Sequence, residues 1–234
     1  MEAEPLLNGI GRKRRTATRL RNLTKTGCGI HSLALPLHPL HETEMLLWRE
    51  KLPDSWLPKV RANLGAVLVD HAHLERKAAT SALSLEKYVE VHGAVSELNA
   101  IAIEELQHFE LVLQLLRERG VPFGAPLRSP WISGMMNALR RGRRFQVIDH
   151  LVVCALIEGR SCEKFQILRD GVRDLDAPLA DFYASLVESE GNHYASYLIM
   201  ARHIDEAETD RRLDFFLDLD AQLIAQPHPL PILH

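Results

Sequence analysis

Two Glu-x-x-His motifs, each flanked by apolar residues at helical spacing, constrain this chain more than any other feature. They are Glu105-Leu-Gln-His108 and Glu190-Gly-Asn-His193. Residues three apart lie on one side of an α-helix, so each motif places a carboxylate beside an imidazole. Each motif also follows another glutamate at nearly the same interval, since Glu75 stands 30 residues before Glu105 and Glu158 stands 32 residues before Glu190. The chain therefore carries the same pattern twice.

The two intervals match the geometry of antiparallel helix pairs, in which residues reach equal height when the turn lies midway between them. The first midpoint falls beside His92-Gly93, a helix-stop signal, and the second falls at Asp174, shortly before Pro178, a helix-start signal. Each glutamate is then roughly 22–24 Å of helix from its turn. All four glutamates are expected at the same height, in the middle of a bundle.

A single Glu-x-x-His motif is weak evidence for a metal, because Glu and His are ordinary residues on helix surfaces. Here, however, the motifs lie on apolar stripes, such as the one on which Leu98, Ile101 and Val112 share a face with Glu105. Unpaired carboxylates in a core are costly unless a cation neutralises them. Four carboxylates with two imidazoles are the ligand set of a carboxylate-bridged di-iron or di-manganese site. The predicted ligands are Glu75, Glu105, His108, Glu158, Glu190 and His193.

Such a site predicts an all-α fold, namely a ferritin-like four-helix bundle with an added C-terminal helix and a long connection between the second and third bundle helices. The expected helices cover residues 56–91, 94–118, 144–169, 178–203 and 207–224, with a short helical piece at 132–139. We expect three segments: a basic, flexible N-terminal tail over residues 1–45, the di-iron domain over residues 46–225, and a Pro-rich C-terminal end over residues 226–234. The tail could instead be a nucleic-acid-binding arm, but we favour a plain flexible tail.

Composition limits the other classes of protein. The 234 residues are 46% apolar and 25% charged, values typical of a soluble protein, and no apolar run is long enough to span a bilayer. The three cysteines, Cys28, Cys154 and Cys162, form no Cys-x-x-Cys pair, which favours reduced thiols in a cytoplasmic protein.

The ligands can be given separate roles from their place in the pattern. We assign Glu105 and Glu190 as bridges between two metals and Glu75 and Glu158 as terminal ligands, while each histidine binds one metal. Hard carboxylates with few imidazoles suit iron or manganese better than copper or zinc.

Groups outside the ligand set are expected to hold the ligands in place, because the second nitrogen of a metal-bound imidazole usually donates to an outer partner. Glu104 is the candidate partner of His193, with a solvated surface glutamate as the alternative. His71, one turn before Glu75, is either such an outer group or a hydrogen-bonded core histidine, and we favour the latter.

Longer strings around the ligands are more specific than the ligands alone. They are Asp70-His-Ala-His-Leu-Glu-Arg-Lys-Ala-Ala79, Glu104-Glu-Leu-Gln-His-Phe-Glu110, Leu113-Gln-Leu-Leu-Arg-Glu-Arg-Gly-Val-Pro122, Ile157-Glu-Gly-Arg-Ser-Cys-Glu-Lys-Phe165 and Ser189-Glu-Gly-Asn-His-Tyr194. Together they resemble the bacterial tRNA-(2-methylthio-isopentenyl-adenosine) hydroxylases over residues 46–225. Many other di-iron monooxygenases carry Thr where this chain has Cys162, a further candidate outer group, so their proton-relay arguments do not transfer.

The resemblance implies a di-iron monooxygenase that uses O2 to hydroxylate the isopentenyl group of a modified adenosine beside the anticodon of tRNA, with two iron ions per chain. A tRNA substrate requires a basic docking surface. The candidates for this surface are five arginines between residues 128 and 144, a stretch without an acidic residue: Arg128, Arg140, Arg141, Arg143 and Arg144. The alternative is that they are only a solvated run of arginines. The chain shows no dinucleotide loop or iron–sulfur cysteine cluster, so we expect no bound nicotinamide or flavin and a separate electron-donor protein.

Three alternatives share the ligand pattern. A quinone-ring hydroxylase should show a membrane-facing apolar surface, a rubrerythrin-like oxidase should work without an organic substrate, and an iron-storage protein should assemble into a shell.

Overall fold

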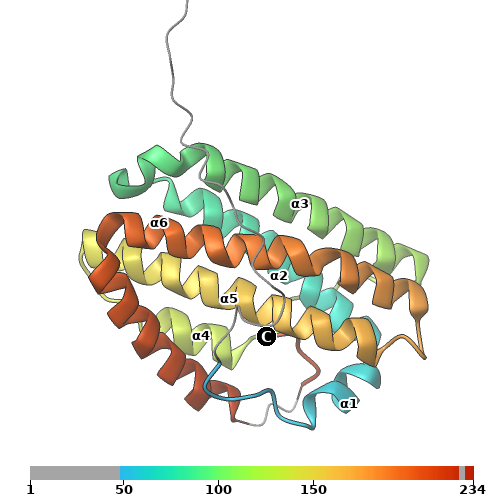
Figure 1. The fold of residues 1–234 in the computed structure, drawn as a ribbon. Helices are drawn as coiled ribbons and strands as arrows, with labels where there is room; N and C mark the ends of the chain where they lie inside the picture. The colour runs from blue at the N-terminus through green and yellow to red at the C-terminus, as the bar shows by residue number, and fades with distance from the viewer. Residues whose placement is uncertain (1–47, 227–229) are drawn as a thin grey trace, which may run out of the picture. The chain divides into compact units, whose positions relative to one another are not determined.

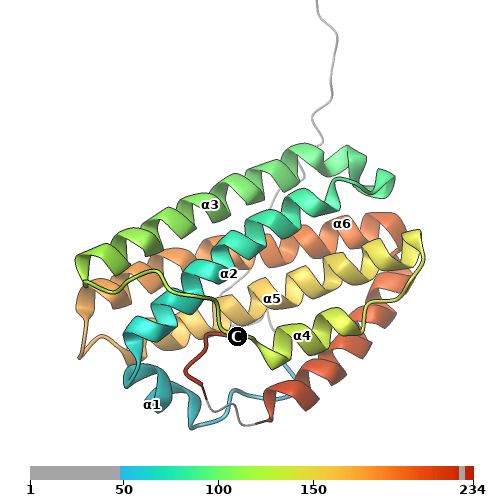
Figure 2. The same ribbon diagram turned by 180° about the vertical axis from the view of Figure 1, so that it is seen from behind.

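The computed structural model describes residues 48–226 and 230–234, and this part of the chain is built from helices joined by loops (Figure 1). The elements are α1 (Trp56–Arg61), α2 (Leu64–Leu85), the 3-10 segment η1 (Val89–Ala94), α3 (Val95–Glu118), α4 (Pro130–Asn137), α5 (Arg143–Gly171) and α6 (Ala177–Ile224). Helices α2 and α3 form one antiparallel pair, and α5 and the first half of α6 form the other (Figures 1 and 2). The predicted all-α, ferritin-like four-helix bundle is confirmed.

The core of the bundle has two apolar clusters. One contains Leu98, Ile148 and Tyr197, and the other contains Leu68 and Phe165. On all four bundle helices, the predicted metal ligands fall in sequence between the residues of these two clusters. A polar layer therefore lies between the two apolar clusters, in the middle of the bundle.

The first predicted helix, residues 56–91, was wrong as a single element. The backbone of Asn63 leaves the helical region, with φ −140° and ψ 36°, and separates α1 from α2. The Asn63 side-chain amide donates to the carbonyl of Lys59 at 2.9 Å, which satisfies a carbonyl at the end of α1. At the other end, α2 stops at Leu85, and η1 leads into α3.

The long connection and the added C-terminal helix are present as predicted. Helix α4 lies within the connection, and the Ser129 hydroxyl caps it by accepting from the backbone N–H of Ile132 at 3.0 Å. Helix α6 breaks at Asp205, where φ is −166°, so its two halves correspond to the predicted helices over residues 178–203 and 207–224. The second half packs against α4 at Gly134, where an added Cβ would lie 2.6 Å from Cδ1 of Leu223.

Residues 230–234, from the segment expected to be a Pro-rich end, contact α2, α4 and α5 (Figure 2). The backbone N–H of Leu233 donates to the Asp70 carboxylate at 2.8 Å, and the ring of His234 stacks on Trp131. The predicted tail over residues 1–45 lies outside the described residues. In the described part of the chain, no helix combines the length and the apolar character that crossing a membrane requires.

Candidate metal centre

The structure brings together all six predicted ligands. Helix α2 supplies one, α5 supplies one, and the Glu-x-x-His motifs of α3 and α6 supply two each. Every one of the six residues is buried, with no more than 7% of its surface exposed. The ligands are Glu75, Glu105, His108, Glu158, Glu190 and His193.

The six side chains form two overlapping groups. In each group, four donor atoms lie within 4.8 Å of one another. One group adds Glu75 and His108 to Glu105 and Glu190, and the other adds Glu158 and His193 to the same two glutamates. Glu105 and Glu190 belong to both groups, which is the arrangement expected of two bridging carboxylates.

Several buried donor atoms of the cluster make no hydrogen bond. They include both carboxylate oxygens of Glu105, Oε1 of Glu190, and the Nδ1 atoms of His108 and His193. Nδ1 of His193 is 2.7 Å from Oε1 of Glu105, without the alignment of a hydrogen bond, and Nδ1 of His108 is 3.8 Å from both Glu75 and Glu190. Buried polar atoms are nearly always satisfied in folded proteins. Convergent orphaned oxygens and nitrogens of this kind fit a metal ion.

The electrostatics of the cluster lead to the same conclusion. Burial is the main cause that raises the pKa of Glu75 to about 7 and the pKa values of Glu105 and Glu158 to about 8, and repulsion between the carboxylates adds to it. Burial also raises the pKa of Glu190. Burial alone lowers the pKa of His193, but its contacts with the carboxylates outweigh this and raise it to about 9. The cluster holds excess negative charge that protons or cations must neutralise.

Of the three candidate outer groups, Glu104 and His71 lie beside a ligand, and Cys162 makes a different contact. Oε2 of Glu104 is 3.0 Å from Nε2 of His193, so the expected contact is present. Nε2 of His71 contacts Oε1 of Glu75, and its ring stacks on Tyr183. Burial lowers the pKa of His71 to about 4, so the ring is neutral near pH 7. Cys162 instead directs its thiol toward the backbone carbonyl of Val187 on α6.

A cavity of about 300 Å³ connects the cluster with the protein surface. We call it the substrate cavity. Three ligands, Glu75, Glu158 and Glu190, line its buried part, whereas Lys77 and Met136 are exposed lining residues. Apolar side chains line much of the wall between them, including Ile132, Ile157 and Phe165.

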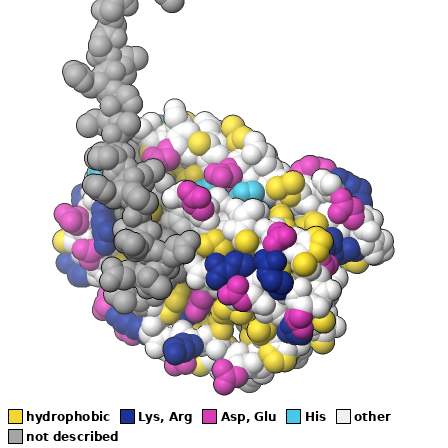
Figure 3. Space-filling model, turned by 45° about the vertical axis from the view of Figure 1, so that its right-hand side comes forward, with side chains coloured by type: hydrophobic (Ala, Val, Ile, Leu, Met, Phe, Trp, Pro, Cys, Tyr) yellow, Lys and Arg dark blue, Asp and Glu magenta, His cyan; other side chains and the backbone are white. Residues whose placement is uncertain are grey.

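The candidate arginines differ in their ion pairs and in their exposure. Arg140 forms ion pairs with Asp149 and Glu208, and Arg144 forms one with Asp205. Arg128 and Arg141 are exposed. On the part of the face that Figure 3 shows uncovered, basic, acidic and apolar side chains are interspersed. The role of the five arginines in tRNA binding, including that of Arg143, stays a prediction.

Sequence reasoning missed one group of residues near the cluster. Ser161 and His234 line the substrate cavity, and Lys164 contacts His234. The string that contains Ser161 and Lys164 was already singled out, but its spacing gave no reason to expect a buried lysine. The position of His234 depends on contacts with residues about 70 positions earlier in the chain.

Comparisons with known proteins agree with this geometry. The family described as tRNA-(MS[2]IO[6]A)-hydroxylase (MiaE) matches residues 39–234. A protein from Pseudomonas putida named tRNA 2-(methylsulfanyl)-N(6)-isopentenyladenosine(37) hydroxylase is 37% identical, over 75% of this chain and 85% of its own length. A protein of the same name from Salmonella typhimurium is 28% identical, over 75% of this chain and 82% of its own length.

A solved structure resembles the fold as a whole. It is "Protein 43 with aldehyde deformylating oxygenase activity from Synechococcus", which is 27% identical, with a TM-score of 0.75. The match covers 80% of this chain and 94% of that one.

Proposed function

The chain belongs to the tRNA-(MS[2]IO[6]A)-hydroxylase family, and we propose that it hydroxylates the isopentenyl group of 2-(methylsulfanyl)-N6-isopentenyladenosine in tRNA. The observation that carries this proposal is the substrate cavity, which runs from the surface to three of the candidate metal ligands. A storage site or a simple oxidase site has no need of an apolar cavity that reaches its metals. The alternatives that act without an organic substrate are therefore less well supported.

The metal centre that we propose is a pair of iron ions. Two divalent cations carry four positive charges, which balance the four buried carboxylates of the cluster. Glu105 and Glu190 would bridge the ions, Glu75 and His108 would complete one coordination sphere, and Glu158 and His193 the other. When bound, the iron would supply the chemistry that activates O2 as the cosubstrate.

The remaining side chains of the cavity would bind and orient the substrate. Its apolar wall, which includes Ile132, Ile157 and Phe165, would hold the hydrocarbon isopentenyl chain away from water. At the exposed part, Lys77 and Thr80 offer a cation and a hydroxyl to the sugar or phosphate of the nucleotide.

Hydroxylation consumes two electrons for each O2. We infer that a separate donor protein supplies them, because the sequence carries neither a dinucleotide-binding loop nor an iron–sulfur motif.

The test is direct. Iron-loaded, chemically reduced protein is mixed with O2 and with tRNA from cells that lack this enzyme, and the nucleosides are separated and weighed by mass spectrometry. We expect the modified adenosine to gain one oxygen atom on its isopentenyl group. A matched variant, Ile157→Trp, fills the cavity without altering a ligand and should keep its iron while losing product. Product at the wild-type level from this variant would contradict the assignment of the cavity.

A further inference from the structure

A buried chain of three polar side chains joins the substrate cavity to a second pocket. Nζ of Lys164 is 3.1 Å from Nδ1 of His234, and Nε2 of His234 is 2.9 Å from Oγ of Ser161. The three side chains belong to residues that are at most 7% exposed. Such a continuous polar path through an apolar bundle is costly to build, so its position calls for a function.

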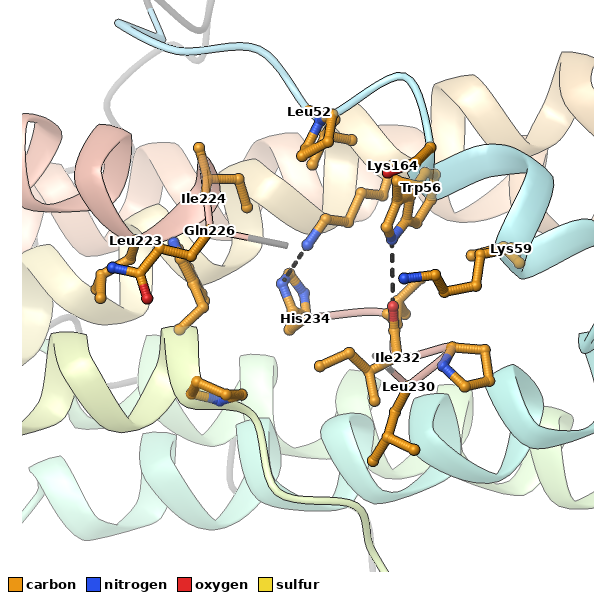
Figure 4. A pocket seen from close by; sticks show the side chains of 17 residues that line it. Leu52, Trp56, Lys59, Lys164, Leu223, Ile224, Gln226, Leu230, Ile232 and His234 are labelled. Atoms are coloured by element: carbon orange, nitrogen blue, oxygen red, sulfur yellow. Dashed lines mark hydrogen bonds between the residues drawn. The ribbon is translucent and has the colours of Figure 1, made fainter. Parts of the chain in front are cut away.

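The second pocket lies beside α1 and the segment of residues 230–234 and has a volume of about 120 Å³ (Figure 4). We call it the end pocket. Lys164 and His234 line it, and so do the exposed residues Ser55 and Gln226, so it reaches the protein surface. His234 and Ser161 also line the substrate cavity. His234 thus separates the two spaces and contacts both.

The hydrogen bonds of the chain run in one direction while Lys164 is charged. The charged ammonium group can only donate, so Nδ1 of His234 then accepts from Lys164. In the neutral ring, Nε2 then carries the hydrogen and donates to Oγ of Ser161. The hydroxyl hydrogen of Ser161 remains available to an acceptor in the substrate cavity. Every donor in the chain therefore points from the end pocket toward the substrate cavity.

We propose that Lys164, His234 and Ser161 form a proton relay that supplies the hydroxylation reaction from the solvent in the end pocket. The inference rests on the proposed function. Hydroxylation with O2 places one oxygen atom in a C–H bond and releases the other as water, which consumes two electrons from the donor protein and two protons. For each proton delivered, Lys164 protonates Nδ1, Nε2 passes its proton to Ser161, and Ser161 passes its own to the oxygen that leaves as water. Solvent then reprotonates Lys164, and exchange with water, in which Nδ1 loses its proton and Nε2 gains one, restores the first tautomer of the ring.

Two features of the site make such a path useful. A nucleotide that fills the substrate cavity covers the exposed lining at Lys77 and Thr80 and so excludes water from that side. The thiol of Cys162 is directed toward the carbonyl of Val187 and offers no hydroxyl there. The end pocket opens elsewhere on the surface and stays available while the substrate is bound.

The electrostatic environment suits a donor that acts near neutral pH. Burial, followed by repulsion from Arg160, lowers the pKa of Lys164 to about 7, while Glu163, Asp220 and Asp70 oppose this shift. Burial also lowers the pKa of His234, so the ring stays neutral between transfers. Lysine can therefore release a proton and regain it without a large free-energy change.

The first experiment compares single turnovers of iron-loaded, reduced protein on modified tRNA. The variants Ser161→Ala and Lys164→Met should form product about 100-fold more slowly, which is the lower end of the contribution that a positioned proton donor usually makes. They should also release more hydrogen peroxide per O2 and show an altered solvent deuterium isotope effect. Ser161→Thr, which keeps the hydroxyl, should restore coupling. Lys59→Met, which changes a cation of the same pocket outside the relay, is the matched control and should behave as wild type.

A second readout needs no metal and no turnover. In the metal-free protein, ¹⁵N chemical shifts of His234 should show a hydrogen on Nε2 and none on Nδ1, and this preference should weaken in Lys164→Met. A hydrogen on Nδ1 in the wild type would reverse the direction of the chain and overturn the relay. Wild-type coupling and isotope effect in both Ser161→Ala and Lys164→Met would also overturn it. If the wild-type protein itself forms no product, the proposed function fails first, and the relay fails with it.

Discussion

Two buried clusters of charged side chains lie in the same bundle, and they differ in whether the chain itself neutralises their charges. In the first, the metal cluster, four glutamates face one another, and several of their oxygens have no hydrogen-bond partner. In the second, which we call the arginine cluster, Arg160 and Asp220 are fully buried and pair with each other. Asp220 also accepts from Nε1 of Trp131 at 2.9 Å, and Arg160 also donates to Glu163 and to the carbonyl of Glu50. Burial of charge is common to both, but only the first lacks a neutralising partner.

The difference separates a candidate metal site from a structural ion pair. The arginine cluster satisfies its charges within the chain and ties α5 to the second half of α6. The metal cluster cannot do so, since its two histidines do not balance its four carboxylates. A buried cluster whose charges do not balance within the chain is therefore a better indicator of a bound cation than buried charge alone.

Removal of a bridging carboxylate should have the largest effect. Glu105→Ala should lose both metals and abolish product formation, because this glutamate belongs to both groups of donors. The same substitution should raise the melting temperature of the metal-free protein, since it removes one of four repelling groups. Metal analysis, nucleoside analysis and thermal unfolding measure the three effects. A single tightly held zinc ion in the wild-type protein would contradict the assignment.

Removal of one partner from the arginine cluster should act on stability instead. Asp220→Ala leaves the Arg160 guanidinium buried without its main partner and should lower the free energy of unfolding by about 3–5 kcal/mol. The exposed Asp218, which pairs with Arg49, offers a matched control, and Asp218→Ala should cost at most about 1 kcal/mol. Urea unfolding separates the two. Equal costs would show that the buried pair contributes no more than a surface pair.

The pH dependence of the metal-free protein should reveal the unbalanced cluster. Burial raises the pKa values of Glu75, Glu105 and Glu158 from an ordinary 4.5 to about 7 or 8. Between these pH values, the folded state therefore binds more protons than the unfolded state. The stability linked to these groups is present below pH 4.5 and is lost as the pH rises through 8. The melting temperature should therefore fall over this range in the metal-free protein, and less so in the iron-loaded one. The same slope in both would argue against metal at these carboxylates.

The sequence predicted the metal cluster well because its signal is periodic. Matched intervals and helical spacing were enough to place Glu75 beside Glu105, whereas the contact of Glu104 with His193 was one of two alternatives that the sequence left open. The arginine cluster and the relay were missed because most of their contacts join residues 60 to 110 positions apart, with no repeat to reveal them.

The break in the first helix was missed for a different reason. Asn63 interrupts an apolar pattern that is regular on both sides of it, so periodicity alone predicts one helix there. Its signal lies in a single polar side chain that returns to the Lys59 carbonyl, and this contact is visible only in the structure.

A smaller effect should follow from the outer contact of His193. Glu104→Gln keeps the shape of the side chain but removes the charge that faces Nε2 of His193. Such outer partners contribute about 10-fold to 100-fold in metal affinity, and the half-exposed position of Glu104 favours the lower value. Glu97→Gln, on the exposed side of α3, is the control. Competition with an iron chelator measures the affinity, and no difference between the two variants would reduce Glu104 to a surface residue.

The smallest effect should come from the arginines. As with the two buried clusters, an arginine whose charge is neutralised within the chain should behave differently from one whose charge is not. Arg140 is already neutralised by Asp149 and Glu208, whereas Arg141 is exposed and makes no ion pair in the part of the chain that the structure describes. A phosphate contact should therefore fall to Arg141. Arg141→Ala should weaken tRNA binding modestly and reduce the slope of log affinity against log salt by about 1, with iron content unchanged. Arg140→Ala should lower stability, because it leaves the buried Asp149 with one basic partner fewer. If Arg140→Ala changed the salt slope and Arg141→Ala did not, the internal ion pairs would have to open on tRNA binding, and charge balance in the free protein would no longer predict which residues contact the substrate.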